Sequence, residues 1–214
     1  MNAGPVNILK MSVILDRVTA FASIVSSIVS AGGIVLLWRQ ISAEHERCRR
    51  EKAIEIMNAF IAINPVEANG LSRLLMNELD KKQSTHLFNM QDVVIDSRSE
   101  ALLKLALAKY AGTNIELEKI EGKIVLRSTE VFMLRALVLN LLNSLESMAS
   151  AWRHNIADRD MLEDEFQYIV VPYGNGGLIY EDFIIASGGF LSLKEFAEAI
   201  SRKENVRSSK RKTA

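Results

Sequence analysis

The polar residue best placed to do chemistry is Glu146, which falls inside an apolar pattern of helical spacing. An isolated carboxylate on a packed face costs several kcal/mol, so it must pair, accept hydrogen bonds or take up a proton. Asn143 lies one turn away on the same side and can bond to it. Two hypotheses arise: a ligand-binding or proton-handling carboxylate, or a structural ion pair with an arginine such as Arg73 or Arg135. We favour the second.

Other groups with possible metal or acid–base chemistry have weaker patterns. His154 is followed by Asp158 and Asp160, but in a turn between helices these residue types usually serve as caps and solvated groups. The acidic run 158–165 lacks the turn glycine and the ligand periodicity of a calcium loop. His45 and Cys48, three residues apart, supply only two ligands. We therefore predict no metal site and no cofactor.

Sequence motifs of enzymes are not recognisable either. The YGNGG stretch at 173–177 has no following lysine and no preceding strand pattern, so it does not fit a phosphate-binding loop. Neither a nucleophile elbow nor a Ser/His/Asp arrangement is visible. Enzymatic activity is thus unsupported, and a non-enzymatic role is expected.

Charge and cysteine content narrow the class of partner. The 26 basic and 26 acidic residues balance, so the chain has no overall attraction for nucleic acid. A basic cluster at 203–212 has no aromatic interleaving, and near a membrane it would gain about 1 kcal/mol per charge from anionic lipid. Cys48 is the single cysteine, which excludes an intrachain disulfide and suits a reducing compartment.

The elements that would position Glu146 are helices. Apolar residues step by four and three along 129–153, which predicts a central helix enclosed by others. Further helices are expected at 53–63, 66–79, 99–110 with a C-cap at Gly112, and from Asp158 or Asp160 to 171. A capping box at Ser192 and Glu195 predicts a last helix ending near 203. Residues 80–85 are expected to form a polar loop, and 178–186 a short apolar segment.

One stretch permits strands. Residues 114–126 alternate apolar and polar about Glu121 and Gly122, which fits a small β-hairpin or, equally, a short helix plus loop. The predicted fold is therefore all-α, possibly with one hairpin.

Residues 18–38 carry no charge and are flanked by Arg17 and Arg39. As a helix they would span on the order of 30 Å, the thickness of the hydrocarbon core of a bilayer. Insertion is worth roughly −3 to −6 kcal/mol, reduced somewhat by serines. The alternatives are a cleaved signal peptide and a buried helix of a soluble protein. For a signal peptide, both the segment before residue 18 and the apolar run itself are long. We predict a transmembrane helix.

Basic residues give the orientation. Arg39, Arg47, Arg49, Arg50 and Lys52 come soon after the segment, so the positive-inside rule places the chain beyond residue 38 in the cytoplasm. The predicted organisation is an extracytoplasmic segment (1–17), the membrane helix (18–38), a stalk and first helix (39–63), a helical cytoplasmic domain (64–203) and a disordered basic tail (204–214). The expected location is the inner (cell) membrane, with the N-terminus outside and the C-terminal domain in the cytoplasm.

Small residues recur along the predicted membrane helix at every fourth position. They form two ridges, one of Ala22, Ser26 and Ser30 and one of Ser23, Ser27 and Ala31. Such ridges let helices approach closely, and hydroxyls can bond across the contact. Serine is also tolerated in any anchor, where it bonds back to its own helix. Self-association through these ridges is one hypothesis and an incidental role is the other.

Residues 137–166 resemble a bacterial family known as domain of unknown function 4760. The resemblance is carried by Asn143, Glu146, Trp152, Arg153 and Asp158. The resemblance is best over 137–166 and looser over 50–185. In the turn that follows the apolar helix, the family often has glycine, whereas this chain has Asn155. The resemblance implies one N-terminal membrane helix joined to a helical cytoplasmic region, and no activity.

The sequence thus predicts a membrane-anchored, non-enzymatic helical interaction or sensor domain. Its expected partners are the lipid bilayer, further copies of the chain and an unidentified protein. One version is an oligomerising membrane effector in bacterial defence. The alternative is a ligand-binding or enzymatic domain with Glu146 at a buried site.

Overall fold

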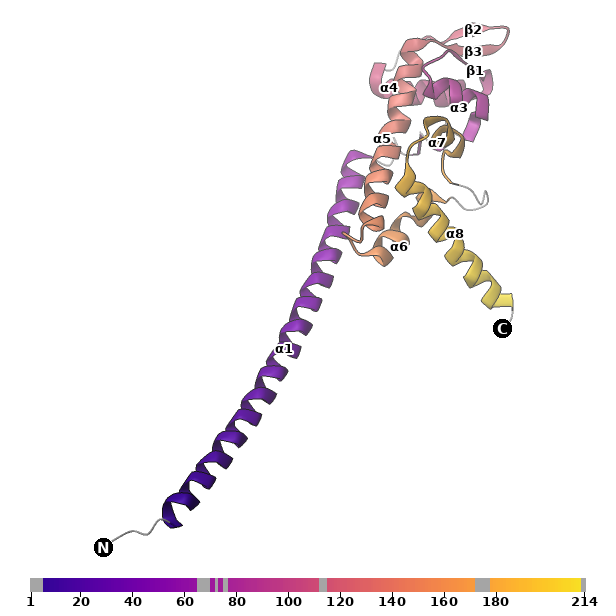
Figure 1. Ribbon diagram of the computed structural model, residues 1–214. Coiled ribbons are helices and arrows are strands. Elements are labelled where there is room, and N and C mark those ends of the chain that lie inside the picture. Colours follow the sequence, from indigo (N-terminus) through magenta and orange to yellow (C-terminus); the bar gives the residue numbers. More distant parts are fainter. Residues whose placement is uncertain are drawn as a thin grey trace. The chain divides into compact units, whose positions relative to one another are not determined.

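The computed structural model describes residues 6–64, 70–71, 73–74, 77–111, 115–171 and 178–212. The chain divides into two compact units, Met1–Cys48 and Arg49–Ala214. The first consists of helix, and the second combines several helices with a 3-stranded sheet (Figure 1). The expectation of an all-α fold with a possible hairpin is therefore corrected to a mainly helical fold with a small sheet.

Helix α1 (Val6–Ile63) contains no proline and no interior break. It ends where predicted, just before the Asn64–Pro65 pair, since a residue preceding proline is disfavoured in the helical region. Asn64 is buried, and its Nδ2 donates to the carbonyl oxygen of Phe60 at 3.2 Å. The predicted stalk is thus continuous helix through residue 63.

Helix α5 (Ser128–Arg153) is the central helix that the periodicity predicts. Its buried residues recur along its whole length and include Leu134, Leu141, Leu145 and Met148. By length and composition, α5 is long and apolar enough to cross a membrane. Because so many of its side chains are buried within the second unit, we interpret α5 as the core helix of a folded domain.

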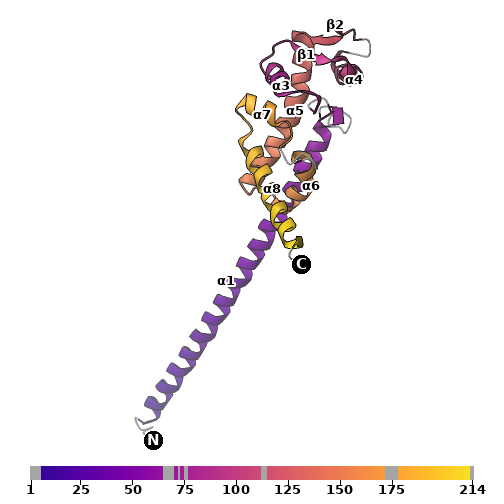
Figure 2. The same cartoon turned by 90° about the vertical axis from the view of Figure 1, so that its right-hand side faces the viewer.

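The sheet joins strands β1 (Val93–Asp96), β2 (Glu118–Ile120) and β3 (Lys123–Leu126) in the antiparallel order β1-β3-β2. Of the two alternatives left open for 114–126, the hairpin is the one observed, as β2 and β3. Its turn residues Glu121 and Gly122 both have positive φ, 50° and 74°, as a tight two-residue hairpin turn requires. Strand β1, opposite β3, was not predicted. Figure 2 shows the sheet beside the start of α5.

Helix α3 (Lys81–Phe88) occupies the stretch expected to be a polar loop, so that prediction is wrong. Asp80 caps it by accepting from the backbone N–H of Gln83, whose side chain in turn accepts from the backbone N–H of Asp80. This reciprocal pair satisfies two N–H groups that otherwise lack partners at a helix start. Leu87 then anchors the helix in the core.

The helix predicted at 99–110 is α4 (Glu100–Ala111), preceded by a 3-10 turn, η1 (Ser97–Ser99). Its proposed C-cap, Gly112, lies outside the described residues. So does much of the helix predicted at 66–79, although the described residues 70–71, 73–74 and 77–78 are helical.

The C-terminal third contains α6 (Arg159–Val170), α7 (Glu181–Ser187) and α8 (Leu191–Lys212). Asp158 caps α6 as predicted, accepting from the N–H of Met161 at 3.1 Å. The 173–177 loop lies outside the described residues. Helix α8 begins one residue before Ser192 and extends through Lys212, beyond the helix end predicted near 203.

Substitutions in α5 test its position in the core. Leu142 is 0% exposed and Leu105, in α4, is 59% exposed. Leu142→Ala leaves a cavity and should lower the free energy of unfolding by about 3 kcal/mol. The same truncation at Leu105 should change it by less than about 0.5 kcal/mol. Denaturant unfolding of the full chain in mild detergent measures both, and equal effects would contradict this placement of α5.

Candidate functional site

Glu146, in the C-terminal half of α5, contacts the start of α8. Its two carboxylate oxygens accept from the backbone N–H groups of Ser192 at 3.1 Å and Leu193 at 2.9 Å. The first turn of a helix has unpaired N–H groups and a partial positive charge, both of which a carboxylate satisfies. Glu146 is half-buried, and this contact joins α5 to α8.

Of the two arginines named as possible partners of Glu146, Arg73 and Arg135, the second is engaged elsewhere. Arg135 Nε donates to the carbonyl oxygen of Phe88 at 2.8 Å, and its guanidinium lies 5.2 Å from the centroid of the Phe88 ring. The hypothesis of a structural role is thus supported, but the predicted arginine partner is replaced by backbone N–H groups. Glu146 and the start of α8 are 46 residues apart in the sequence, so residue spacing could not predict this contact.

The same contact corrects the capping box predicted at Ser192. Since α8 starts at Leu191, Ser192 is inside its first turn and donates its N–H to Glu146. Glu195 does not reach back along its own helix; it forms an ion pair with Arg153 of α5 at 2.9 Å. The cap of α8 is therefore supplied by α5, which fixes the position of one helix on the other.

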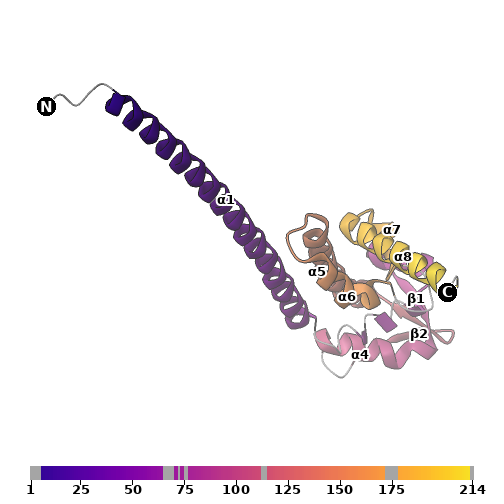
Figure 3. The same cartoon turned by 90° about the horizontal axis from the view of Figure 1, so that it is seen from below.

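A second carboxylate, Glu163 of α6, is more deeply enclosed, with 7% of its surface exposed. Trp152 Nε1 donates to its Oε1 at 2.7 Å, and Lys203 Nζ of α8 forms a short ion pair with its Oε2. This bond to Glu163 raises the pKa of Lys203 above its usual value, an effect that burial partly opposes. Glu163 thus joins α5, α6 and α8, which lie against one another (Figure 3).

The turn between α5 and α6 connects to α1. Asn155 adopts φ 55°, and its N–H and that of Ile156 return to the carbonyls of Trp152 and Ala151. Asparagine tolerates this left-handed conformation, so the turn forms without the glycine expected from the family resemblance. The Asp158 N–H then donates to the carbonyl oxygen of Arg49 at 3.0 Å, and its carboxylate lies 3.5 Å from Arg50 Nε.

The residues predicted as one polar cluster therefore act at several separate contacts. Glu146 binds the start of α8, Trp152 binds Glu163, and Arg153 pairs with Glu195. Asp158 caps α6, whereas Asn143 is exposed. Sequence analysis missed Glu163 and Lys203 because an acidic run and a basic tail usually indicate solvated surface.

No group of three or more His, Cys, Asp or Glu residues suited to a metal occurs within the described ranges. Cys48 is exposed, with its Sγ 3.9 Å from Glu44 Oε1.

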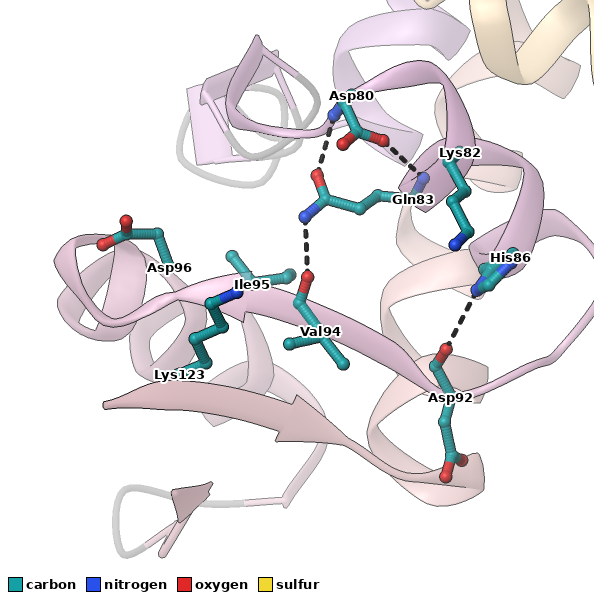
Figure 4. Close-up of a pocket in the computed structure, with 9 residues that line it drawn as sticks. All are labelled: Asp80, Lys82, Gln83, His86, Asp92, Val94, Ile95, Asp96 and Lys123. Atoms are coloured by element: carbon teal, nitrogen blue, oxygen red, sulfur yellow. Dashed lines mark hydrogen bonds between the residues drawn. The ribbon is translucent and has the colours of Figure 1, made fainter. Parts of the chain in front are cut away.

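A pocket of about 400 Å³ lies between α3 and the outer edge of β1 (Figure 4). Gln83 Nε2 donates to the Val94 carbonyl at 2.6 Å, and His86 Nδ1 lies 3.2 Å from the Asp92 carbonyl. These two side chains cover carbonyl groups that an edge strand otherwise leaves open. Lys82 and Lys123 also line the pocket.

The acidic groups of this pocket are already engaged. Asp80 caps α3, Asp92 pairs with Arg127 at 2.7 Å, and Asp96 pairs with Arg98 at 3.1 Å. The bonds to Arg98 lower the pKa of Asp96. Among its described lining residues the pocket has no serine or cysteine nucleophile. Its polar and charged lining suits contact with a polar molecule.

No known protein family, curated protein or solved structure matches the chain. The resemblance carried by Asn143, Glu146, Trp152, Arg153 and Asp158 therefore stays a prediction.

Substitution of Glu146 distinguishes a structural carboxylate from a functional one. Glu146→Gln removes the charge from the start of α8 and should lower the free energy of unfolding by about 1 kcal/mol. Hydrogen exchange at the amides of Ser192 and Leu193 should accelerate with it. Glu198→Gln is the matched control, because Glu198 is a solvated side chain on the same helix. Unchanged stability and exchange in Glu146→Gln would contradict the structural assignment.

Proposed function

We propose that this chain is a single-pass membrane protein in which residues 18–38 anchor a folded cytoplasmic domain. The domain acts without catalysis, as an interaction or sensor module at the membrane surface. The exposed apolar circumference of α1 carries the proposal.

Residues 34–38 of α1 are all apolar, and their side chains are between 57% and 69% exposed. Successive helix residues are about 100° apart, so consecutive positions cover the whole circumference. Phe21 and Val29 are equally exposed at 69% each, and the stretch between them and residue 38 is uncharged. A helix that is apolar on every side needs apolar surroundings on every side.

A single protein partner would cover only one side of such a helix. Lipid covers all sides at once, and a helix satisfies its own backbone hydrogen bonds within hydrocarbon. The length of 18–38 fits the bilayer core, as the sequence predicts. Lipid is therefore the solvent that suits this part of α1 best.

The domain following the anchor supports a non-catalytic role. Glu146, the residue on which an enzymatic alternative depends, is occupied by the backbone of α8. The pocket beside β1 offers polar side chains to a small molecule or a peptide, which suits sensing or partner binding. The basic residues after the anchor favour a cytoplasmic location for the domain.

Arginine substitutions in the anchor test the proposal. Ser26→Arg with Val29→Arg should add about 5–7 kcal/mol to the cost of insertion, enough to offset the estimated gain. The double variant should move from the membrane pellet to the soluble fraction after alkaline carbonate extraction. Ser26→Ala with Val29→Ala, as control, should stay in the pellet. Wild-type chain in the soluble fraction without detergent would refute the anchor.

We further propose that the anchors of several chains self-associate. In one version of this function, the oligomer perturbs the membrane as an effector in bacterial defence. Ser26, Ser30 and Ala31 are exposed, so this part of the ridges is free for contact. The Ser30 hydroxyl donates to the Ser26 carbonyl at 2.9 Å, which leaves its oxygen able to accept a bond. The side chains of Ala22, Ser23 and Ser27 lie outside those described.

Enlarging the ridge should separate self-association from an incidental role. Ser26→Leu with Ser30→Leu prevents close approach of the backbones, so oligomers detected by crosslinking in mild detergent should be lost. Phe21→Trp, on the side of the helix opposite both ridges, adds bulk without blocking them and should preserve the oligomers. Oligomers that survive the serine substitutions would show that the small residues are incidental.

A further inference from the structure

The end of the domain nearest the anchor is defined by contacts within Arg49–Ala214. The backbone carbonyl of Arg49, where this unit begins, accepts from Asp158 at the start of α6. Farther along α1, the Phe60 ring lies 5.0 Å from that of Phe166. From residue 49 onward, α1 therefore follows α6 away from the α5–α6 turn. The chain from the anchor thus enters the domain beside this turn.

Helix α8 leaves the domain at the same end. It starts beside Glu146, seven residues before the end of α5, and its Phe196 ring lies 5.2 Å from that of Trp152, one residue before that end. It next reaches α6 through Lys203, which bonds Glu163 and lies 3.5 Å from Asp160. Asp160 follows Asp158 by two residues, so α8 runs toward the entry point of the chain and continues beyond it.

Past Lys203, the helix becomes strongly basic. Positions 207, 210 and 211 are three and four residues apart, so Arg207, Lys210 and Arg211 share one face of α8; we call them the basic ridge. Lys212 follows, and 205–214 contain no acidic residue. The spacer between the proposed anchor and Arg49, residues 39–48, is about 15 Å of helix at 1.5 Å per residue. Chain connectivity alone therefore keeps this end of the domain near lipid.

We propose that the basic ridge binds the anionic phospholipid headgroups of the membrane in which α1 is anchored. Each basic residue near such a surface is attracted by its negative potential, and the attraction falls off within a Debye length. The Lys203–Glu163 ion pair has a positioning role, because it fixes α8 to α6 just before the ridge. The inference rests on the proposed anchor and adds a second, charge-dependent membrane contact.

The experiment uses the full chain in nanodiscs. A fluorophore is attached at Ser209→Cys in a Cys48→Ser background, and lipids with nitroxide on the headgroup serve as quencher. Quenching should be strong when about a third of the lipid is anionic phosphatidylglycerol, weak in purely zwitterionic discs, and reversed at about 0.5 M salt. Arg207→Gln with Lys210→Gln and Arg211→Gln should lower the ratio of bound to free tail on the order of 100-fold.

Lys81→Gln with Lys82→Gln and Lys123→Gln is the matched control. It removes the same charge from exposed side chains around α3 and the sheet, and should leave quenching unchanged. Equal quenching in both lipids, or equal loss in both triple variants, would overturn the proposal. Displacement of the tail from anionic discs by added RNA at the same salt would also overturn it, in favour of nucleic acid. A chain that elutes apart from discs refutes anchor and ridge together, whereas an incorporated chain with an unresponsive label refutes only the ridge.

Discussion

Apolar side chains on every side of residues 34–38 are the constraint on which the organisation of this protein depends. Burying them against protein would require partners around the whole helix, whereas lipid surrounds them without any specific contact. Charged residues return at Arg39, and the helix continues as a polar stalk. In the proposed anchoring, the first part of this continuous helix lies in lipid and the next part in water, and the folded domain begins only after that change.

Within the domain, polar contacts at helix ends set how the helices pack. Of the described helices, α5 contributes the most buried apolar residues to the core, but this apolar surface does not by itself specify a unique arrangement of its neighbours. Glu146 specifies where α8 begins on α5, and Glu163 ties α6 and α8 to Trp152. A carboxylate that is partly or fully buried is stable only when its oxygens accept hydrogen bonds. Each of the two therefore favours a single arrangement of the helices. The residues that first suggested chemistry therefore account for architecture.

Sequence periodicity predicted the elements that depend on local pattern. The central helix, the cap at Asp158, the hairpin turn at Gly122 and the end of α1 before Pro65 all have strong local signals. Helix α3 was missed although Asp80 and Gln83 have capping-box spacing, because its composition is polar. Strand β1 is only four residues long and forms by pairing with β3, which is distant in sequence. The partners of Glu146 and Lys203 are likewise tertiary contacts that spacing along one helix does not encode.

Cysteine accessibility along α1 tests the membrane anchor most directly. Single cysteines at each position from 29 to 48, in a Cys48→Ser background except at 48 itself, are exposed to a membrane-impermeant maleimide in native membranes opened to both faces. Lipid on all sides predicts protection at every position through 37 and labelling beyond about residue 41. Labelling that rises and falls with a period of about 3.6 residues would instead show one face packed on protein and the other in water, and would contradict the anchor.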